Sequence, residues 1–315
     1  MNMLTKLGLA LVACGLLVAH FAHAEEAQPE EKPQTLFTNV NIYDGLTPKL
    51  IENANVLVEG NLIKAVSTNP IKADGATIID GGGRTLTPGL IDSHTHLSLV
   101  APLDQVGEMD WGEIGVRMAV IAEDQLMRGF TTVRDLCGNT HGLRAAINAG
   151  AAPGPRIVSA GACISPRSGH GDFYGYNIQK GEHPLERYGI VRIVDGPTEI
   201  RTAIREEFRK GASFIKLMMG GGLASAYDPL DVTTLQPDEV EAAVRETENW
   251  GTYATAHIYT DRGINMGLDA GMKTFEHTHL ASRETYERFA KEGIVISAQV
   301  HAIGIDAEHL DRLAG

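Results

Sequence analysis

The chain has no excess of positive charge. It carries 27 lysine and arginine residues against 40 aspartate and glutamate residues, which gives a formal net charge of −13 at pH 7. Nucleic acid is therefore not an expected partner, because its phosphates favour clustered basic side chains. The remaining composition, 43% hydrophobic and 21% charged over 315 residues, is that of a soluble globular protein with one large domain, or with one large and one small domain.

Long apolar runs are also scarce. The run at residues 7–21 is shorter than the roughly 20 residues that a membrane-spanning helix needs. Lys6 precedes it, and residues 22–24, Ala-His-Ala, follow it with the small-x-small pattern of a cleavage site. We therefore predict a signal peptide over residues 1–24, export to the periplasm, and no attachment of the mature chain to the membrane.

Cysteine occurs only three times. Cys14 ends a segment that resembles a bacterial lipobox, so a lipoprotein anchored through Cys14 is the alternative to a freely exported chain. Cys137 and Cys163 would meet an oxidising compartment after export. We expect both to be free and buried; a disulfide between them is the alternative, because they follow neighbouring predicted strands.

Two regions differ in their hydrophobic pattern. Residues 25–34 are rich in Glu, Pro and Gln and lack apolar periodicity, which predicts a flexible leader. Residues 35–87 contain short alternating segments separated by turn signals such as Asp44-Gly45 and Gly60-Asn61, which predicts a small β-sheet subdomain. Its predicted strands are 36–42, 54–58, 63–66 and 76–79.

From Pro88 onward, strand-like segments alternate with helical ones. The predicted strands are 88–93, 130–134, 156–160, 213–219, 252–256, 273–276 and 294–299. The predicted helices include 113–128, 197–210, 236–250 and 283–292. This alternation predicts parallel βαβ units. Seven such strands over 88–315 indicate a (β/α)₈ TIM-type barrel whose eighth strand is missing, with its site at the carboxyl ends of the strands.

Basic and imidazole side chains follow several of these strands. His94 and His96, two residues apart at the end of the first strand, point to the same face and form half of a metal site. Lys216 lies in an apolar strand, where burial lowers the pKa of its amine. A neutral amine can be carboxylated by CO₂ to a metal-bridging carbamate; an ion-paired or snorkelling lysine is the alternative.

His257 and His277 end the fifth and sixth predicted strands. Each histidine alone would have a core or surface role by default. Four histidines and one lysine at the strand ends of one repeating fold instead predict a centre of two divalent metal ions. Imidazole ligands favour zinc.

These positions resemble the binuclear amidohydrolase superfamily. Further segments resemble its branch of prolidase-like dipeptidases and carboxypeptidases, which includes ochratoxin-hydrolysing amidases. These segments are 129–135, 154–157, 168–172 and 211–216, and the resemblance extends from about residue 35 to residue 315. It implies that His94 and His96 hold one metal ion, that carboxylated Lys216 bridges both ions, and that His257 and His277 hold the second.

The resemblance also implies the reaction. A hydroxide bridging the metal ions would attack the amide carbonyl of an Xaa-Pro-type or other dipeptide, or of an N-acyl amino acid. His170, in a Gly-flanked loop, would stabilise the oxyanion or orient the substrate, and Tyr259 would bind the substrate carboxylate. A structural role at the rim is the alternative for these two residues.

Other functions are left open. A cyclic-amide hydrolase acting on imidazolone-like or hydantoin-like rings would share the same site. The superfamily's strand-eight aspartate lies beyond Gly315, so we also consider a non-catalytic, truncated metal-binding protein, and expect weak metal binding and little hydrolysis from this chain. The expected partner is a small-molecule or dipeptide substrate, and a homo-oligomer is left open.

Overall fold

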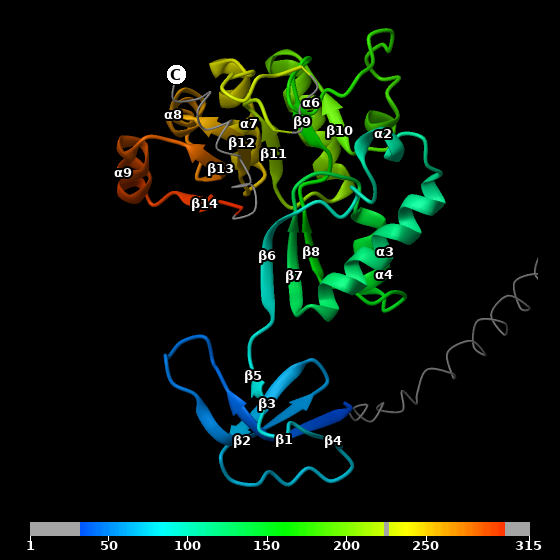
Figure 1. The fold of residues 1–315 in the computed structure, drawn as a ribbon, viewed down its shortest axis with the longest axis vertical. Helices are drawn as coiled ribbons and strands as arrows, with labels where there is room; N and C mark the ends of the chain where they lie inside the picture. The colour runs from blue at the N-terminus through cyan, green and yellow to red at the C-terminus, as the bar shows by residue number, and fades with distance from the viewer. Residues whose placement is uncertain (1–31, 224–226, 300–315) are drawn as a thin grey trace, which may run out of the picture. The chain divides into compact units, whose positions relative to one another are not determined.

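The computed structural model describes residues 32–223 and 227–299, which divide into two units at residues 88 and 89 (Figure 1). The predicted signal peptide, most of the predicted leader and Cys14 lie outside the described residues. Within the described ranges, no helix has the length and apolar character to cross a membrane.

The first unit contains a five-stranded sheet. Its strands are β1 (Gln34–Ile42), β2 (Ile51–Glu59), β3 (Leu62–Ser67), β4 (Thr77–Asp80) and β5 (Thr85–Leu86). The order is β3-β2-β1-β4, and β5 also pairs with β1. β2 and β3 form an antiparallel hairpin at Gly60, whose φ of 61° suits a two-residue turn. Alternating residues of β1 and β2, among them Val40 and Val56, form the small core of this unit.

The second unit is an α/β structure in which every strand pairing is parallel. One sheet contains β6 (Leu90–Thr95), β7 (Phe130–Asp135) and β8 (Arg156–Ser159). The other has the order β10-β9-β11-β12-β13-β14. Its strands are β9 (Cys163–Ser165), β10 (Val191–Ile193), β11 (Ile215–Met218), β12 (Ala254–Thr260), β13 (Thr274–Leu280) and β14 (Val295–Ser297). All seven predicted strands are present with shifted bounds, whereas β9 and β10 were not predicted.

Helices connect these strands. They are α2 (Leu103–Val106), α3 (Trp111–Met127), α4 (His141–Asn148), α5 (Pro184–Arg187), α6 (Gly196–Lys210), α7 (Pro237–Asn249), α8 (Asp261–Asp269) and α9 (Arg283–Glu292). α3 and α4 lie along the β6–β7–β8 sheet (Figure 1). α7 begins with a capping box between Gln236 and Glu239, and α6 ends at Gly211, whose φ of 100° is left-handed. The four predicted helices are confirmed.

The described strands form two sheets and not a closed barrel. The third predicted strand, 156–160, corresponds to β8, and Gly161, where φ is 72°, separates it from the unpredicted β9, so that β8 pairs with β7 while β9 pairs with β11. The outermost strands β6 and β14 share no ladder, yet their side chains meet, because Ser93 Oγ lies 3.0 Å from Ser297 Oγ. The parallel α/β architecture is therefore confirmed, and closure of the barrel is not seen in the described residues.

Two apolar clusters hold the second unit together. In one, α6, α7 and α8 pack on β11 and β12 through residues such as Ile204, Val240 and Ile264. In the other, α3 packs on β7 through Met118 and Val133. Met218, at the end of β11, belongs to the second cluster and also lines the pocket that contains the predicted site residues.

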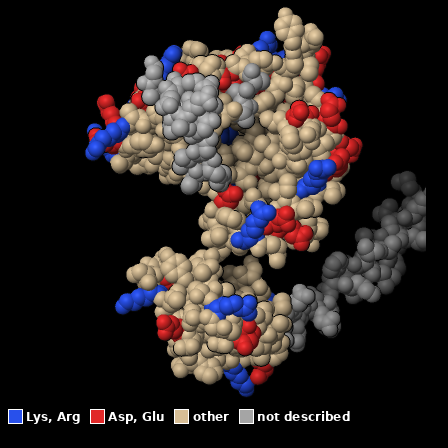
Figure 2. Space-filling view, in the orientation of Figure 1, with Lys and Arg blue, Asp and Glu red and all other residues tan. Residues whose placement is uncertain are grey.

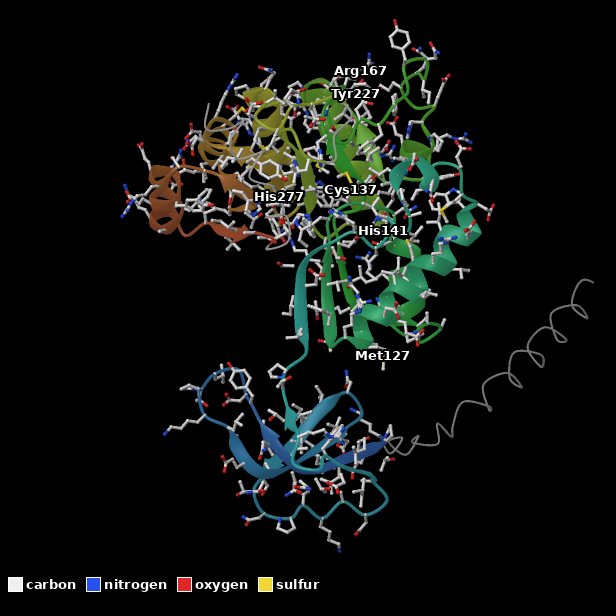
Figure 3. The ribbon with its side chains drawn as sticks, viewed as in Figure 1. Met127, Cys137, His141, Arg167, Tyr227 and His277 are labelled. Carbon is white, nitrogen blue, oxygen red and sulfur yellow. A yellow bond between two sulfur atoms is a disulfide. The ribbon has the colours of Figure 1, made fainter. Side chains whose placement is uncertain are left out.

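Cys137 and Cys163 form a disulfide (Figure 3). Both cysteines are buried, as expected, but the expectation that they are free is wrong, and the paired alternative holds. Cys137 follows β7 and Cys163 begins β9, and a hydrogen bond of 2.8 Å from Gly138 N to Gly161 O joins the two segments. This backbone contact brings the two Cα atoms to 4.8 Å, within the usual range for a disulfide.

Candidate metal centre

The predicted site residues meet in one pocket of about 160 Å³. They come from β6, β11, β12 and β13 and from the segments that follow β6 and β9. The strands are parallel, so their carboxyl ends open at the same edge and bring residues distant in sequence together. The pocket is lined by His94, His96, His170, Lys216, Met218, Leu223, His257, Tyr259 and His277.

His94 and His96 face each other at the end of β6. Their Nε2 atoms are 3.2 Å apart, as expected for two imidazoles directed at one point. Burial and the nearby charge of Lys216 together lower the pKa of His94 to about 4, against the opposing effect of Glu276. Burial also holds the pKa of His96 well below its ordinary value. Both rings are therefore neutral at physiological pH, the state that binds metal.

Lys216 lies in the centre of β11 and is 1% exposed. Burial lowers the pKa of its amine to about 8, while the charge of Glu276 acts in the opposite direction. Among the described residues, no acidic side chain forms an ion pair with its ammonium group. A substantial fraction of the amine is thus neutral near physiological pH, as carboxylation by CO₂ requires.

His257 and His277 come from the paired strands β12 and β13, and the ring centroid of His277 lies 5.0 Å from that of His94. The ring centroids of His257 and His277 are 4.4 Å apart, and His257 Nε2 lies 2.8 Å from the carbonyl oxygen of Gly221. His277 (labelled in Figure 3) and Thr278 both have positive φ, 71° and 60°. Such backbone strain in non-glycine residues is concentrated at functional sites. Burial holds the pKa of both imidazoles well below the ordinary value.

His170 is held over His257 by a glycine-rich segment. The two rings are stacked with centroids 3.9 Å apart. A Cβ on Gly222 would lie 2.0 Å from His170 Cε1, so only glycine fits at this position. Asp228 Oδ2 lies 3.7 Å from His170 Nδ1.

Tyr259 extends the same wall of the pocket. Its ring is stacked on that of His277 at 5.1 Å, and burial raises the pKa of its phenol to about 12. The hydroxyl therefore stays protonated at physiological pH and can donate a hydrogen bond. The structure thus brings all seven predicted site residues together.

Sequence reasoning did not find Glu276. Its side chain is fully buried, and Oε2 accepts a hydrogen bond of 2.8 Å from His94 Nδ1. Oε1 accepts from Arg134 Nη1 at 2.6 Å and from Thr255 Oγ1 at 2.7 Å. Burial raises the pKa of Glu276, but these partners and the charge of Lys216 outweigh it and leave the pKa below the ordinary value. A charged residue within an apolar strand segment is the sequence feature that could have indicated Glu276, as it did Lys216.

Asp135 was also missed. It is buried at the end of β7 and accepts hydrogen bonds from Leu97 N at 3.0 Å and from Thr140 Oγ1 at 2.8 Å. Burial raises the pKa of its carboxyl to about 7. By holding the backbone that follows His96, Asp135 fixes the end of the His-x-His segment.

The donor set fits divalent metal ions in its chemistry. Four neutral imidazoles and one amine with a lowered pKa surround the pocket, and the Nδ1 atom of His277 is buried without a hydrogen-bond partner. Within the described residues, no three His, Cys, Asp or Glu side chains are already arranged as a ligand set. The fit of the pocket to divalent metal ions therefore rests on the type and the burial of its donor atoms.

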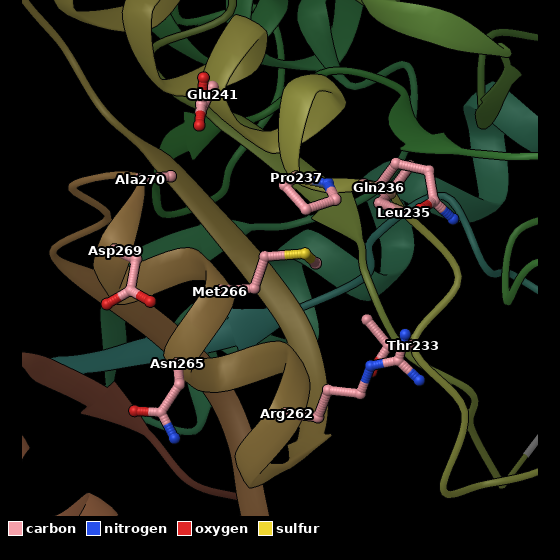
Figure 4. A pocket seen from close by; sticks show the side chains of 10 residues that line it. All are labelled: Thr233, Leu235, Gln236, Pro237, Glu241, Arg262, Asn265, Met266, Asp269 and Ala270. Carbon is pink, nitrogen blue, oxygen red and sulfur yellow. The ribbon is translucent and has the colours of Figure 1, made fainter.

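A larger pocket of about 370 Å³ lies between α7 and α8 (Figure 4). It is lined by the side chains of Thr233, Arg262 and Met266 among others, and contains no histidine or lysine. The surface shown in Figure 2 has acidic and basic side chains interspersed in both units. Neither feature competes with the histidine pocket as a catalytic site.

An α/β fold with parallel strands that end in histidines and one buried lysine defines a class of hydrolases. The sequence profile of the Amidohydrolase family matches residues 85–314, and the chain belongs to that family. The resemblance to its prolidase-like and ochratoxinase branch is confirmed by the individual relatives.

Three of these relatives illustrate the likeness. Ochratoxinase from Aspergillus niger is 32% identical over 238 residues, which cover 70% of this chain and 48% of that protein. A prolidase crystallised with N-methylphosphonate-L-proline is 34% identical, with a TM-score of 0.79 over 84% of this chain and 66% of the other. A Xaa-Pro dipeptidase with methionine in its active site is 26% identical, with a TM-score of 0.73 over 84% and 66%. The chain thus spans about half the length of the curated relative.

Proposed function

We propose that this protein hydrolyses amide bonds with the aid of two divalent metal ions, zinc being the expected metal. The observation that carries the proposal is the gathering of five buried nitrogen donors in one pocket, each with a pKa lowered by burial. His94 and His96 would hold one ion, His257 and His277 the other, and Lys216, as a carbamate, both. When bound, the ions would supply an activated water and polarise the scissile carbonyl.

Carboxylation of Lys216 needs a neutral amine. The Nζ lone pair forms a bond to the carbon of CO₂, and the amine loses a proton to solvent, so that a carbamate anion results. The buried amine, with its pKa of about 8, is poised for this step. The anion would also offset part of the positive charge that two cations bring into a pocket lined by neutral imidazoles.

His170 and Tyr259 would act on the substrate. His170 lies against His257 at the rim, where its imidazole can donate to the oxyanion that develops on the carbonyl oxygen. Tyr259 keeps its proton and can donate to a substrate carboxylate. Each contact would place the scissile amide over the pocket.

For the substrate we propose Xaa-Pro-type or other dipeptides, or N-acyl amino acids. Support comes from the relatives, which include an ochratoxinase, a prolidase seen with a proline phosphonate, and a Xaa-Pro dipeptidase. The reacting group in such substrates is an amide next to a carboxylate, which matches a metal pocket flanked by the Tyr259 hydroxyl.

The test is a substrate panel with purified protein, Zn²⁺ and bicarbonate. We expect slow cleavage of Xaa-Pro dipeptides or N-acyl amino acids by this chain, and no opening of hydantoin or imidazolone rings. Lys216→Met should lower kcat/KM by on the order of 100-fold or more, because it removes the metal-bridging group. Ring opening alone would indicate the cyclic-amide alternative. Metal binding without turnover of any substrate would indicate a binding protein.

A further inference from the structure

Glu276 occupies an unusual position for a carboxylate. It lies in β13 directly before the pocket histidine His277, and yet both residues contact His94. In a regular strand, consecutive side chains point to opposite faces. The left-handed backbone at His277 breaks this alternation, and β13 loses its regular register with β12 at the same place. The strain therefore places a carboxylate and an imidazole on the same side of the strand.

The contact with Glu276 sets the tautomer of His94. An ionised carboxylate can only accept hydrogen bonds, so the proton of the neutral imidazole lies on Nδ1, which is 2.8 Å from Glu276 Oε2. The lone pair then lies on Nε2, the atom that faces His96 Nε2 across 3.2 Å. The imidazole thus presents its free lone pair to the point where a metal ion would bind.

Arg134 holds Glu276 in its turn. Its Nη1 donates to Glu276 Oε1 at 2.6 Å and to the carbonyl oxygen of Ser93 at 3.2 Å, and its Nε donates to Tyr253 Oη at 3.2 Å. Its guanidinium carbon lies 4.3 Å above the ring centre of Phe214. These contacts connect the segments around β6, β7, β11, β12 and β13, so neither charged side chain can rotate without breaking several of them.

We propose that Glu276 is the positioning residue of His94, and that Arg134 acts through Glu276 in the same role. The chain Arg134–Glu276–His94 fixes the ring orientation and the tautomer of a metal ligand. Outer partners of this kind typically contribute 10–100-fold to metal affinity. The inference deepens the proposed function, because it rests on the metal centre that includes His94.

Three variants test this inference. Glu276→Gln keeps an oxygen that can accept from His94 but places an amide group against Arg134 and Thr255. The double variant Arg134→Met with Glu276→Met removes both charges and the acceptor for His94, and leaves neither charge buried without its partner. The matched control is Glu207→Gln, since Glu207 is equally buried and contacts Arg192, Lys210 and Ala162 N. Its neighbouring histidine is His141, which does not line the metal pocket.

The measurements are Zn²⁺ affinity by chelator competition, the visible absorption of bound Co²⁺, and the thermal midpoint of the metal-free protein. We expect Glu276→Gln and the double variant to bind Zn²⁺ about 10–100-fold more weakly than the wild type and to alter the Co²⁺ spectrum. Glu207→Gln should match the wild type in affinity and spectrum. The double variant should bind Zn²⁺ more weakly while its metal-free form unfolds at nearly the same thermal midpoint. This combination distinguishes a loss of ligand positioning from a loss of folding stability.

Two other outcomes are informative in different ways. If the wild type binds Zn²⁺ and the double variant binds it equally tightly with the same Co²⁺ spectrum, the positioning role is wrong and the metal centre stands. If the wild type itself binds neither metal, the proposed function is wrong, and the positioning role is overturned with it.

Discussion

At the scale of single residues, burial decides the charge of the pocket. The imidazoles of His94 and His96 are kept neutral chiefly because an imidazolium would lose its hydration there. The same effect lowers the pKa of Lys216 and raises that of Asp135. Glu276 instead keeps its negative charge, because the effects of His94, Lys216 and Arg134 on its pKa outweigh that of burial. A set of neutral nitrogens beside one anchored carboxylate is a suitable environment for divalent cations.

Asp135 gives a pH prediction at this scale. Its folded-state pKa of about 7 exceeds the ordinary 3.8, so between these values the folded protein binds a proton that the unfolded chain has lost. Asp135 therefore makes the metal-free protein less stable as the pH rises from 3.8 to about 7. Asp135→Asn keeps an acceptor for Leu97 N and a partner for Thr140, and should raise the free energy of unfolding at pH 8 by on the order of 3 kcal/mol.

Urea unfolding at pH 5 and pH 8 checks this prediction. The gain from Asp135→Asn should be clearly larger at pH 8 than at pH 5, because the buried carboxyl is largely protonated at the lower pH. An equal effect of the substitution at both pH values would show that the carboxyl does not titrate in this range.

At the scale of elements, the connections after the strands shape the pocket. The segment after β11 approaches His170 so closely that a side chain at residue 222 has no room. Gly161 separates β8 from β9 and allows β9 to turn toward β11. In the middle of β13, two consecutive left-handed residues direct Glu276 and His277 to the same neighbour, His94. Departures from regular strand geometry therefore lie where the site is formed.

Gly222→Ala tests the element that holds His170. The added Cβ would meet His170 Cε1 at 2.0 Å and displace the ring from its stack on His257. If His170 stabilises the oxyanion, kcat/KM should fall by about 100-fold. The bound Zn²⁺ should stay the same, since His170 is not a proposed ligand.

The control for this variant is Gly115→Ala, in the N-terminal part of α3. Apart from the helix's own backbone and the adjoining residues, no atom lies within 4 Å of the added Cβ, so activity should be unchanged and stability should rise by roughly 0.5–1 kcal/mol. Steady-state kinetics and metal analysis of both variants measure kcat/KM and the bound Zn²⁺. Full activity in Gly222→Ala would exclude a catalytic contact by His170.

At the scale of the whole molecule, the disulfide and the predicted signal peptide point to the same compartment. A disulfide between Cys137 and Cys163 persists where the surroundings are oxidising, which agrees with the proposed export of the chain. We expect the protein from its native source to begin at Glu25 and to contain no free thiol before reduction and two after it. Intact-mass analysis with alkylation in denaturant, before and after reduction, measures both.

Each result that would contradict this prediction has a different meaning. A retained N-terminal segment would remove the support for a cleaved signal peptide, and a lipid on Cys14 would indicate an anchored lipoprotein. Two thiols that react without reduction would show that the disulfide does not form in the native compartment. Removal of the bridge by Cys163→Ala should lower the free energy of unfolding by about 3 kcal/mol, as is typical for a loop of this length, 26 residues.

Much of this protein is determined by the sequence itself. The two-residue period of strands places His94 and His96 on one face, the alternation of strands and helices predicts parallel strands, and an apolar segment around Lys216 predicts its burial. These are local properties, because they depend on residues a few positions apart and on the transfer of side chains out of water.

Only the tertiary structure decided the remaining features. The pairing of Cys137 with Cys163, the break at Gly161 and the contact of Glu276 with His94 join segments up to 182 residues apart. No local pattern encodes such contacts, because they arise when separate strands share an edge and the chain leaves regular geometry to meet them. The sequence therefore determines which side chains can bind metal, and the fold determines which buried partners orient them.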